Sequence, residues 1–212
     1  MMAFEEMSQA VISGDEAKVK ELVNSAVNAK ESPLAIINDG LIAGMNVVGA
    51  RFKEGDMFVP EVLMAAKAMA AGVDIVKPLL GADDMPSAGT VVLGTVKGDL
   101  HDIGKNLVAM MMESGGLNVI NVGIDVAPET FIEAVKANNA QIVAMSALLT
   151  TTMPAMKDTI EAFQEAGLRD KVKIIVGGAP ISQEFADQIG ADGYAPDAAS
   201  ATDLVKKLIS EM

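Results

Sequence analysis

The spacing of hydrophobic and polar positions changes near residue 82. Before that point apolar residues recur every three or four positions, as in "DEAKVKELVNSAVNAK" (15–30), where Val19, Val23 and Val27 share one face. This period is typical of amphipathic helices. From residue 90 onward, short runs rich in β-branched residues alternate with amphipathic stretches, as in a chain of alternating strands and helices. The pattern therefore predicts two parts of different architecture.

The first part predicts helices and no strand. Ser13 or Asp15 can cap the second helix, and Ser32 with Pro33 is typical of the start of the third. The expected helices span about 2–12, 15–30, 32–55 and 58–81. Because short connections join them, we expect an antiparallel four-helix bundle.

The second part predicts a parallel sheet. Its expected strands are 90–96, 117–123, 141–147, 172–178 and 191–196, and its expected helices are 103–114, 128–138, 152–166, 181–189 and 199–211. Apolar strands that alternate with helices favour a parallel sheet covered on both faces. Five such units favour the flavodoxin-like, or Rossmann-like, strand order 2-1-3-4-5, in which ligands bind at the carboxyl ends of the first and third strands.

The two parts are joined by "ADDMPSAG" (82–89), which is polar and short. It predicts a linker. The expected organisation is therefore a helical bundle over 1–81, a linker over 82–89 and an α/β domain over 90–212.

Composition excludes several classes of function. The 212 residues carry a net charge of −13, which argues against nucleic-acid partners. With no cysteine, disulfides, thiolate zinc sites and cysteine-held iron–sulfur clusters are excluded. No basic region precedes an apolar one at the N-terminus, and no run reaches 18 uninterrupted apolar residues. We therefore expect a cytoplasmic protein with no membrane partner.

Candidate chemistry lies in the loop after the first expected strand. "GTVKGDLHDIGKN" (94–106) contains the only histidine, His101, between Asp99 and Asp102. The loop after the third strand, 146–154, carries four hydroxyl side chains. Because the two strands are expected to be neighbours, both loops should meet at the ligand-binding edge of the sheet.

The histidine loop is open to several interpretations. Asp99 or Asp102 could cap the helix that begins near Ile103. A nucleotide loop would need G-x-G-x-x-G or the Walker pattern, and neither is present. A phosphoacceptor aspartate would need a lysine after a later strand, whereas Lys171 and Lys173 precede the fourth.

The remaining interpretation is a metal ligand. A neutral imidazole binds metal through one nitrogen while its other N–H donates to a carboxylate. Asp99, two residues before His101, is well placed to accept that bond. Because the chain offers few other nitrogen or sulfur ligands, a cofactor that brings its own equatorial ligands would suit it.

Three motifs in the second part resemble those of a known protein family. Asp99-x-His101-x-x-Gly104, Ser146-x-Leu148 and Gly177-Gly178 are similar to the cobalamin-binding domain of methionine synthase and of carbon-skeleton mutases. The segment 44–69 resembles the helical cap that precedes this domain in methionine synthase and in corrinoid proteins of methyltransferase systems. Mutases lack that cap. The resemblance covers nearly the whole chain and is closest to free-standing corrinoid proteins.

The resemblance implies a cofactor and a role for each matching residue. The cofactor would be cobalamin or a related cobamide bound base-off/His-on, with His101 as the cobalt ligand in place of the lower base. Asp99 would accept the second N–H of His101, and Thr152 would continue this relay. The other implied contacts are Gly98, Leu100, Asp102, Ile103, Gly104, Ser146, Leu148, Thr150, Gly177, Gly178 and Ala198, with Phe52 and Val59 over the upper face of the corrin.

The resemblance also implies a function. The protein would be a corrinoid methyl carrier of one-carbon metabolism in an anaerobic cytoplasm, non-catalytic alone. Its cobalt would accept a methyl group from a donor-specific methyltransferase and pass it to a second, tetrahydrofolate- or thiol-dependent methyltransferase. A reductive activator would be a further partner, and the linker 82–89 would be the hinge of the cap.

Three other functions are weighed against the carrier. A cobalamin-dependent sensor would normally add a DNA-binding or signalling domain, which the sequence does not contain. A mutase small subunit would lack the helical cap. A flavodoxin-like domain without cobamide is the third alternative. The methyl donor, whether methylamine, methanol, betaine or an aryl methyl ether, is not fixed by the sequence.

Overall fold

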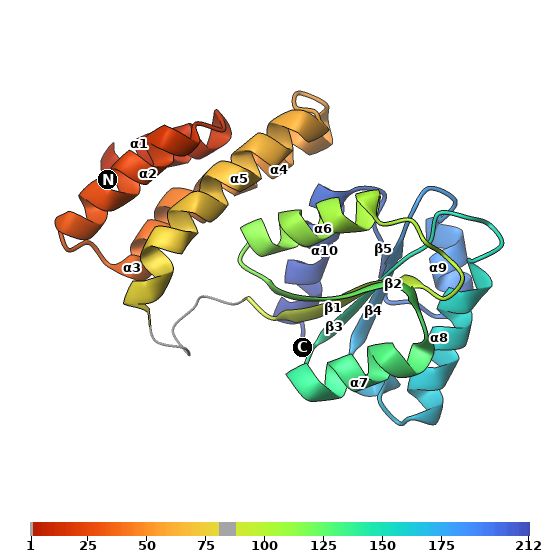
Figure 1. Ribbon diagram of the computed structural model, residues 1–212. Helices are drawn as coiled ribbons and strands as arrows, with labels where there is room; N and C mark the ends of the chain where they lie inside the picture. The colour runs from red at the N-terminus through yellow and green to blue at the C-terminus, as the bar shows by residue number, and fades with distance from the viewer. Residues whose placement is uncertain (1, 81–87) are drawn as a thin grey trace. The chain divides into compact units, whose positions relative to one another are not determined.

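The computed structural model describes residues 2–80 and 88–212, which fall into a helical unit and an α/β unit (Figure 1). Residues 82–87 of the expected linker lie outside the described residues. The expected boundaries, with a bundle over 1–81, a linker over 82–89 and an α/β domain over 90–212, stay a prediction.

The helical unit confirms the four expected helices. Its elements are α1 (Met2–Ile12), α2 (Glu16–Asn28), α3 (Pro33–Ala35), η1 (Ile36–Ile42), α4 (Ala43–Glu54), α5 (Val59–Val76) and η2 (Lys77–Leu79), of which α3, η1 and α4 follow one another without a break. Asp15 caps α2 by accepting a hydrogen bond from the Lys18 amide. Gly55, with φ of 80°, ends α4 in the left-handed conformation that glycine adopts without strain.

The middle of the third helix is a π-helix, which the apolar period does not predict. Over Ile36–Ile42 the hydrogen bonds span five residues, and the Ala43 N–H donates to the Asn38 carbonyl. By length and composition alone, Pro33–Glu54 could cross a membrane, with a mean hydropathy of 1.3. Its buried residues, which include Leu41 and Met45, instead pack in the bundle, where this helix contacts α1 and α5.

The α/β unit confirms the expected parallel sheet and strand order. Its elements are β1 (Thr90–Val96), α6 (Ile103–Ser114), β2 (Asn118–Val126), α7 (Pro128–Asn138), β3 (Ile142–Ser146), α8 (Pro154–Glu165), η3 (Arg169–Lys171), β4 (Lys173–Gly177), α9 (Gln183–Ile189), β5 (Gly193–Tyr194) and α10 (Ala198–Ser210). All pairings are parallel, in the order β2-β1-β3-β4-β5. The carboxyl ends of β1 and β3 therefore lie side by side.

Helices cover both faces of this sheet (Figure 1). Val91 and Leu93 of β1 belong to the apolar cluster with α6 and α10. Val92 and Val96 belong to the opposite cluster, with α7, α8 and α9. Burial on both faces explains why the central strands are continuous apolar runs instead of alternating ones.

Two strands differ from the expected ranges by more than one residue at an end. β2 continues to Val126, three residues beyond the predicted end at 123, and its register with β1 shifts twice on the way. β5 contains only Gly193 and Tyr194, although a strand was predicted over 191–196. Apolar patterning locates strands, but it contains no signal for bulges or for where pairing stops.

Close packing of β1 against α7 gives the first prediction. A Cβ on Gly94 would lie 2.8 Å from the Phe131 ring and 2.7 Å from the Val122 side chain, whereas a Cβ on Gly104 would meet nothing within 4 Å. We expect Gly94→Ala to lower the unfolding free energy of the apoprotein by about 1–3 kcal/mol. Gly104→Ala should change it by less than about 0.5 kcal/mol. Urea titration measures both, and equal losses would contradict the packing argument.

Candidate functional site

The loops that follow β1 and β3 form the candidate site. Thr95, next to the end of β1, pairs with Ser146, the last residue of β3. This register brings the histidine loop and the hydroxyl-rich loop together at the carboxyl edge of the sheet, as the strand order predicts.

The Asp99 carboxylate joins the two loops. Its side chain is fully buried. One oxygen, Oδ2, accepts hydrogen bonds from the Leu148 amide at 2.7 Å, the Leu149 amide at 3.3 Å and the Thr152 hydroxyl at 2.7 Å. The other oxygen, Oδ1, accepts from the His101 amide at 3.1 Å and lies 2.7 Å from His101 Nδ1. The β3 loop therefore fixes the group that orients the imidazole.

These bonds set the ionisation of Asp99. Burial by itself raises the pKa of this carboxyl, but hydrogen bonds from Thr152, Leu148 and His101 outweigh it and hold the pKa well below its usual range. An ionised carboxylate can only accept, so Nδ1 of His101 must carry the proton. In the neutral ring, Nε2 then has a free lone pair.

The imidazole is open to a ligand on its Nε2 side. The His101 side chain is 48% exposed, and no protein group within 2–80 and 88–212 hydrogen-bonds Nε2. The same residues contain no cluster of three or more histidine, aspartate or glutamate side chains that could hold a metal ion. His101 can therefore serve as one ligand to a metal that arrives with its others.

Exposed apolar side chains and open space accompany the imidazole. Leu100 is 67% exposed and Ile103 is 86% exposed, although both are large and hydrophobic. Leu148, whose amide binds Asp99, is also exposed. Around Gly104 the space that a side chain would fill is empty, so the protein's own packing does not require glycine there. These features fit a large, partly apolar cofactor.

The paired glycines at the end of β4 lie close to neighbouring backbone. Gly178 has φ of 128°, and a Cβ there would lie 1.9 Å from the Ala147 carbonyl oxygen. A Cβ on Gly177 would lie 3.0 Å from the Ala195 carbonyl oxygen. The backbones after β3 and β4 therefore approach too closely for any side chain at 178.

The structure places the other predicted contacts on the same edge of the sheet or close to it. The Asp102 backbone carbonyl accepts from the Asn106 amide at the start of α6, and the Asp102 carboxylate accepts from the Asn106 side chain. The rest are Gly98 in the turn after β1, Ser146 at the end of β3, exposed Thr150 in the following loop, and buried Ala198 at the start of α10. Their roles toward a cofactor stay predictions.

Phe52 and Val59 lie in the helical unit. Val59, at the start of α5, is 40% exposed, and Phe52 in α4 is half-buried. Their side chains are therefore not fully used by the core of the bundle. A role over the corrin stays a prediction.

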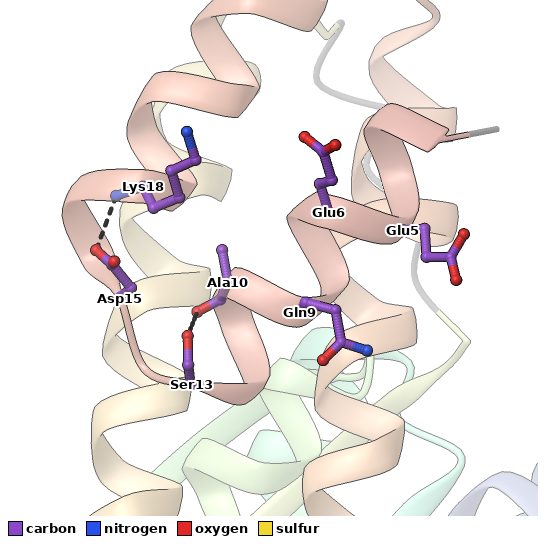
Figure 2. Close-up of a pocket in the computed structure, with 7 residues that line it drawn as sticks. All are labelled: Glu5, Glu6, Gln9, Ala10, Ser13, Asp15 and Lys18. Carbon is purple, nitrogen blue, oxygen red and sulfur yellow. Dashed lines mark hydrogen bonds between the residues drawn. The ribbon is translucent and has the colours of Figure 1, made fainter.

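A groove lies along α1 and the start of α2. It encloses about 580 Å³ and is lined by Glu5, Glu6, Gln9, Ala10, Ser13, Asp15 and Lys18. As Figure 2 shows, Ser13 donates to the Ala10 carbonyl and the Lys18 amide donates to Asp15. These polar groups serve the turn between the helices, so the groove adds nothing to the candidate site.

Three side chains near the loop were not singled out by the sequence. The hydroxyl of Thr95, fully buried in β1, donates to the His101 carbonyl at 2.8 Å. Asp125 contacts the turn before Asp99. Lys105 donates to Asn121 at 2.7 Å, and burial lowers its pKa. Thr95 could have been found from the sequence, because it is a hydroxyl side chain inside an otherwise apolar strand. No comparable feature of the sequence distinguishes Asp125.

Comparison with known proteins agrees with this geometry. One family model described as "B12 binding domain" matches residues 89–203, and a second with the same description matches residues 3–77. The two matches cover the α/β unit and the helical unit separately. The fold and the site thus define a B12-binding protein.

Individual relatives show which group of B12-binding proteins the chain belongs to. The chain is 47% identical to the dimethylamine corrinoid protein of Methanosarcina barkeri, with 97% of each chain covered. It is 44% identical to trimethylamine corrinoid protein 1 of Methanosarcina acetivorans, covering 94% of this chain and 92% of the relative. The crystal structure of the methanol:cobalamin methyltransferase complex MtaBC from M. barkeri matches with a TM-score of 0.89 and 34% identity, covering 100% of this chain and 81% of that one. The chain belongs to the corrinoid proteins of methyltransferase systems.

The bond between Thr152 and Asp99 gives the second prediction. Thr152→Val keeps the shape of the side chain but removes a donor to a buried carboxylate. We expect the unfolding free energy of the apoprotein to fall by about 1–3 kcal/mol. Thr152→Ser, which keeps the hydroxyl, should lose much less. Urea titration at neutral pH measures the difference, and equal stability of the valine and serine variants would contradict the bond.

Proposed function

We propose that the protein is a methyl carrier that would hold a cobamide base-off, with His101 as the ligand to cobalt. The observation that carries this proposal is the imidazole whose Nδ1–H is held by buried Asp99 while Nε2 is open. Hydrogen bonding to a carboxylate raises the basicity of a metal-binding imidazole. A bound corrinoid would supply a cobalt centre that accepts and gives up a methyl group.

The residues of the chain would hold the cofactor and control the proton on the histidine. His101 would ligate through Nε2, and Asp99 would keep the ring oriented and the proton on Nδ1. Thr152 donates to the same carboxylate, so it would stabilise the ionised form of Asp99 whenever the ligand bond changes strength. Gly104 would leave room for the displaced nucleotide tail, and Ser146, Leu148 and Thr150 would line its crevice. Gly177 and Gly178 would allow close backbone approach.

The helical unit would protect the reactive face. Phe52 and Val59 would exclude water from the corrin, and the segment 82–89 would be the hinge that lets them move away. Shielding is needed because a transferable methyl group must be kept from water until the acceptor arrives. In this proposal the functional boundaries are those expected from the sequence, 1–81, 82–89 and 90–212.

The partners would be methyltransferases. Relatives named for dimethylamine and trimethylamine, and a related structure with methanol:cobalamin methyltransferase, support methylamines or methanol as the source of the methyl group. The acceptor would be a tetrahydrofolate- or thiol-dependent methyltransferase in the cytoplasm, and a reductive activator would maintain the cofactor. Matches over nearly the whole chain to proteins of methyltransferase systems favour this function over a sensor.

The binding mode gives the third prediction. After reconstitution and desalting, electron paramagnetic resonance of the Co(II) form should show splitting from one axial nitrogen. The splitting should be unchanged when the lower base of the cofactor carries nitrogen-15, and His101→Ala should abolish it. Splitting that follows the labelled lower base would contradict the proposed ligand.

The carrier role gives the fourth prediction. Reduced holoprotein incubated with a methylamine or methanol methyltransferase and a 14C-methyl donor should acquire label on its cofactor. Adding a thiol- or tetrahydrofolate-dependent methyltransferase with its acceptor should remove that label. Holoprotein alone should do neither, and label that the protein acquires without a partner would contradict a carrier that depends on separate enzymes.

A further inference from the structure

A β-bulge places Asp125 against the turn that precedes Asp99. Opposite the single residue Thr95, between the pairs Gly94–Gly123 and Val96–Val126, β2 has the two residues Ile124 and Asp125. Bulges re-aim side chains and are common next to functional sites. Here the bulge lies beside the strand end that leads into the histidine loop.

Asp125 contacts this turn through both its backbone and its side chain. Its amide donates to the Asp99 carbonyl at 3.0 Å, and its carboxylate accepts from the Gly98 amide at 2.7 Å. The two bonds flank the peptide that joins Gly98 to Asp99. Together they fix the direction in which the chain enters the ligand loop.

The backbone of Asp125 is held in an unfavourable conformation. Its φ is 52°, in the left-handed region that Asp tolerates better than most residues but that still disfavours a side chain. Strain of this kind persists where surrounding structure requires it and is concentrated at functional sites. The sheet itself does not need the side chain, which is exposed.

We infer that Asp125 is a positioning residue for the histidine ligand, an inference that rests on the proposed function. By holding Gly98 and Asp99 in place, it keeps the Asp99 carboxylate where His101 Nδ1 can donate to it. Without this carboxylate the turn, which contains flexible Gly98 at φ of 83°, gains other conformations. The imidazole is then less well preorganised for its ligand position.

The test compares two substitutions at this position. D125G removes the carboxylate, and glycine adopts the left-handed conformation without strain. D125N keeps a side-chain oxygen that can accept the Gly98 N–H, and asparagine also tolerates this backbone. Asn139, at φ of 49° after α7, lies at the other edge of the sheet, so N139G is a matched control for the glycine substitution.

The first readout uses apoprotein. Amide hydrogen exchange at Gly98 should be roughly fivefold faster in D125G than in the wild type, the factor expected for one ordinary hydrogen bond. D125N and N139G should match the wild type at Gly98. Unchanged exchange in D125G, or an equal increase in D125N, would overturn the inference without involving the cofactor.

The second readout uses reconstituted protein. The ratio of His-ligated to unligated Co(II), measured by electron paramagnetic resonance, should fall roughly fivefold in D125G and recover in D125N. A wild-type ratio in D125G would overturn the positioning role. If the wild type itself lacks the His101 splitting, the proposed function fails, and the exchange experiment still decides whether Asp125 holds the turn.

Discussion

The candidate site depends on one buried carboxylate. Asp99 is removed from water and can stay ionised only because five donor contacts surround it, from two backbone amides of the β3 loop, a hydroxyl, and the amide and ring of His101. An ionised carboxylate with fewer partners would be costly at this depth. The loops after β1 and β3 therefore have to be adjacent and correctly shaped before the imidazole can be held.

The strand order satisfies this requirement. In the order β2-β1-β3-β4-β5 the first and third strands are neighbours. The loops that follow them are about 50 residues apart in sequence, yet they lie next to each other in the fold. The close approach of Gly178 to Ala147 keeps β4 and its following loop beside β3. The helices of the α/β unit itself lie on the two faces of its sheet, so they leave this edge to the loops (Figure 1).

Sequence patterning predicted the elements, the strand order and the two loops that meet at the carboxyl edge of the sheet. The apolar runs located all five strands, and the strand order placed the loop of Asp99 and His101 beside the loop of Leu148 and Thr152. The π-segment over Ile36–Ile42, the bulge in β2 and the brevity of β5 were missed, because they depend on tertiary packing and on backbone hydrogen bonding. Asp125 was missed for the same reason. Nothing in the sequence distinguishes this aspartate from others, because its contact with Gly98 depends on the bulge in β2.

The distribution of polarity around His101 links the fold to its chemistry. On the Nδ1 side of the ring lies the buried and fully bonded carboxylate of Asp99, whereas the imidazole itself is about half exposed. Its neighbours in the loop, Leu100 and Ile103, are large apolar side chains exposed to solvent. A protein stabilises a metal–imidazole bond from the far side of the ring and leaves the near side for the metal and its own ligands. Asp99 and its donors thus orient the lone histidine from the Nδ1 side, and Nε2 is left with a lone pair that can bind a metal.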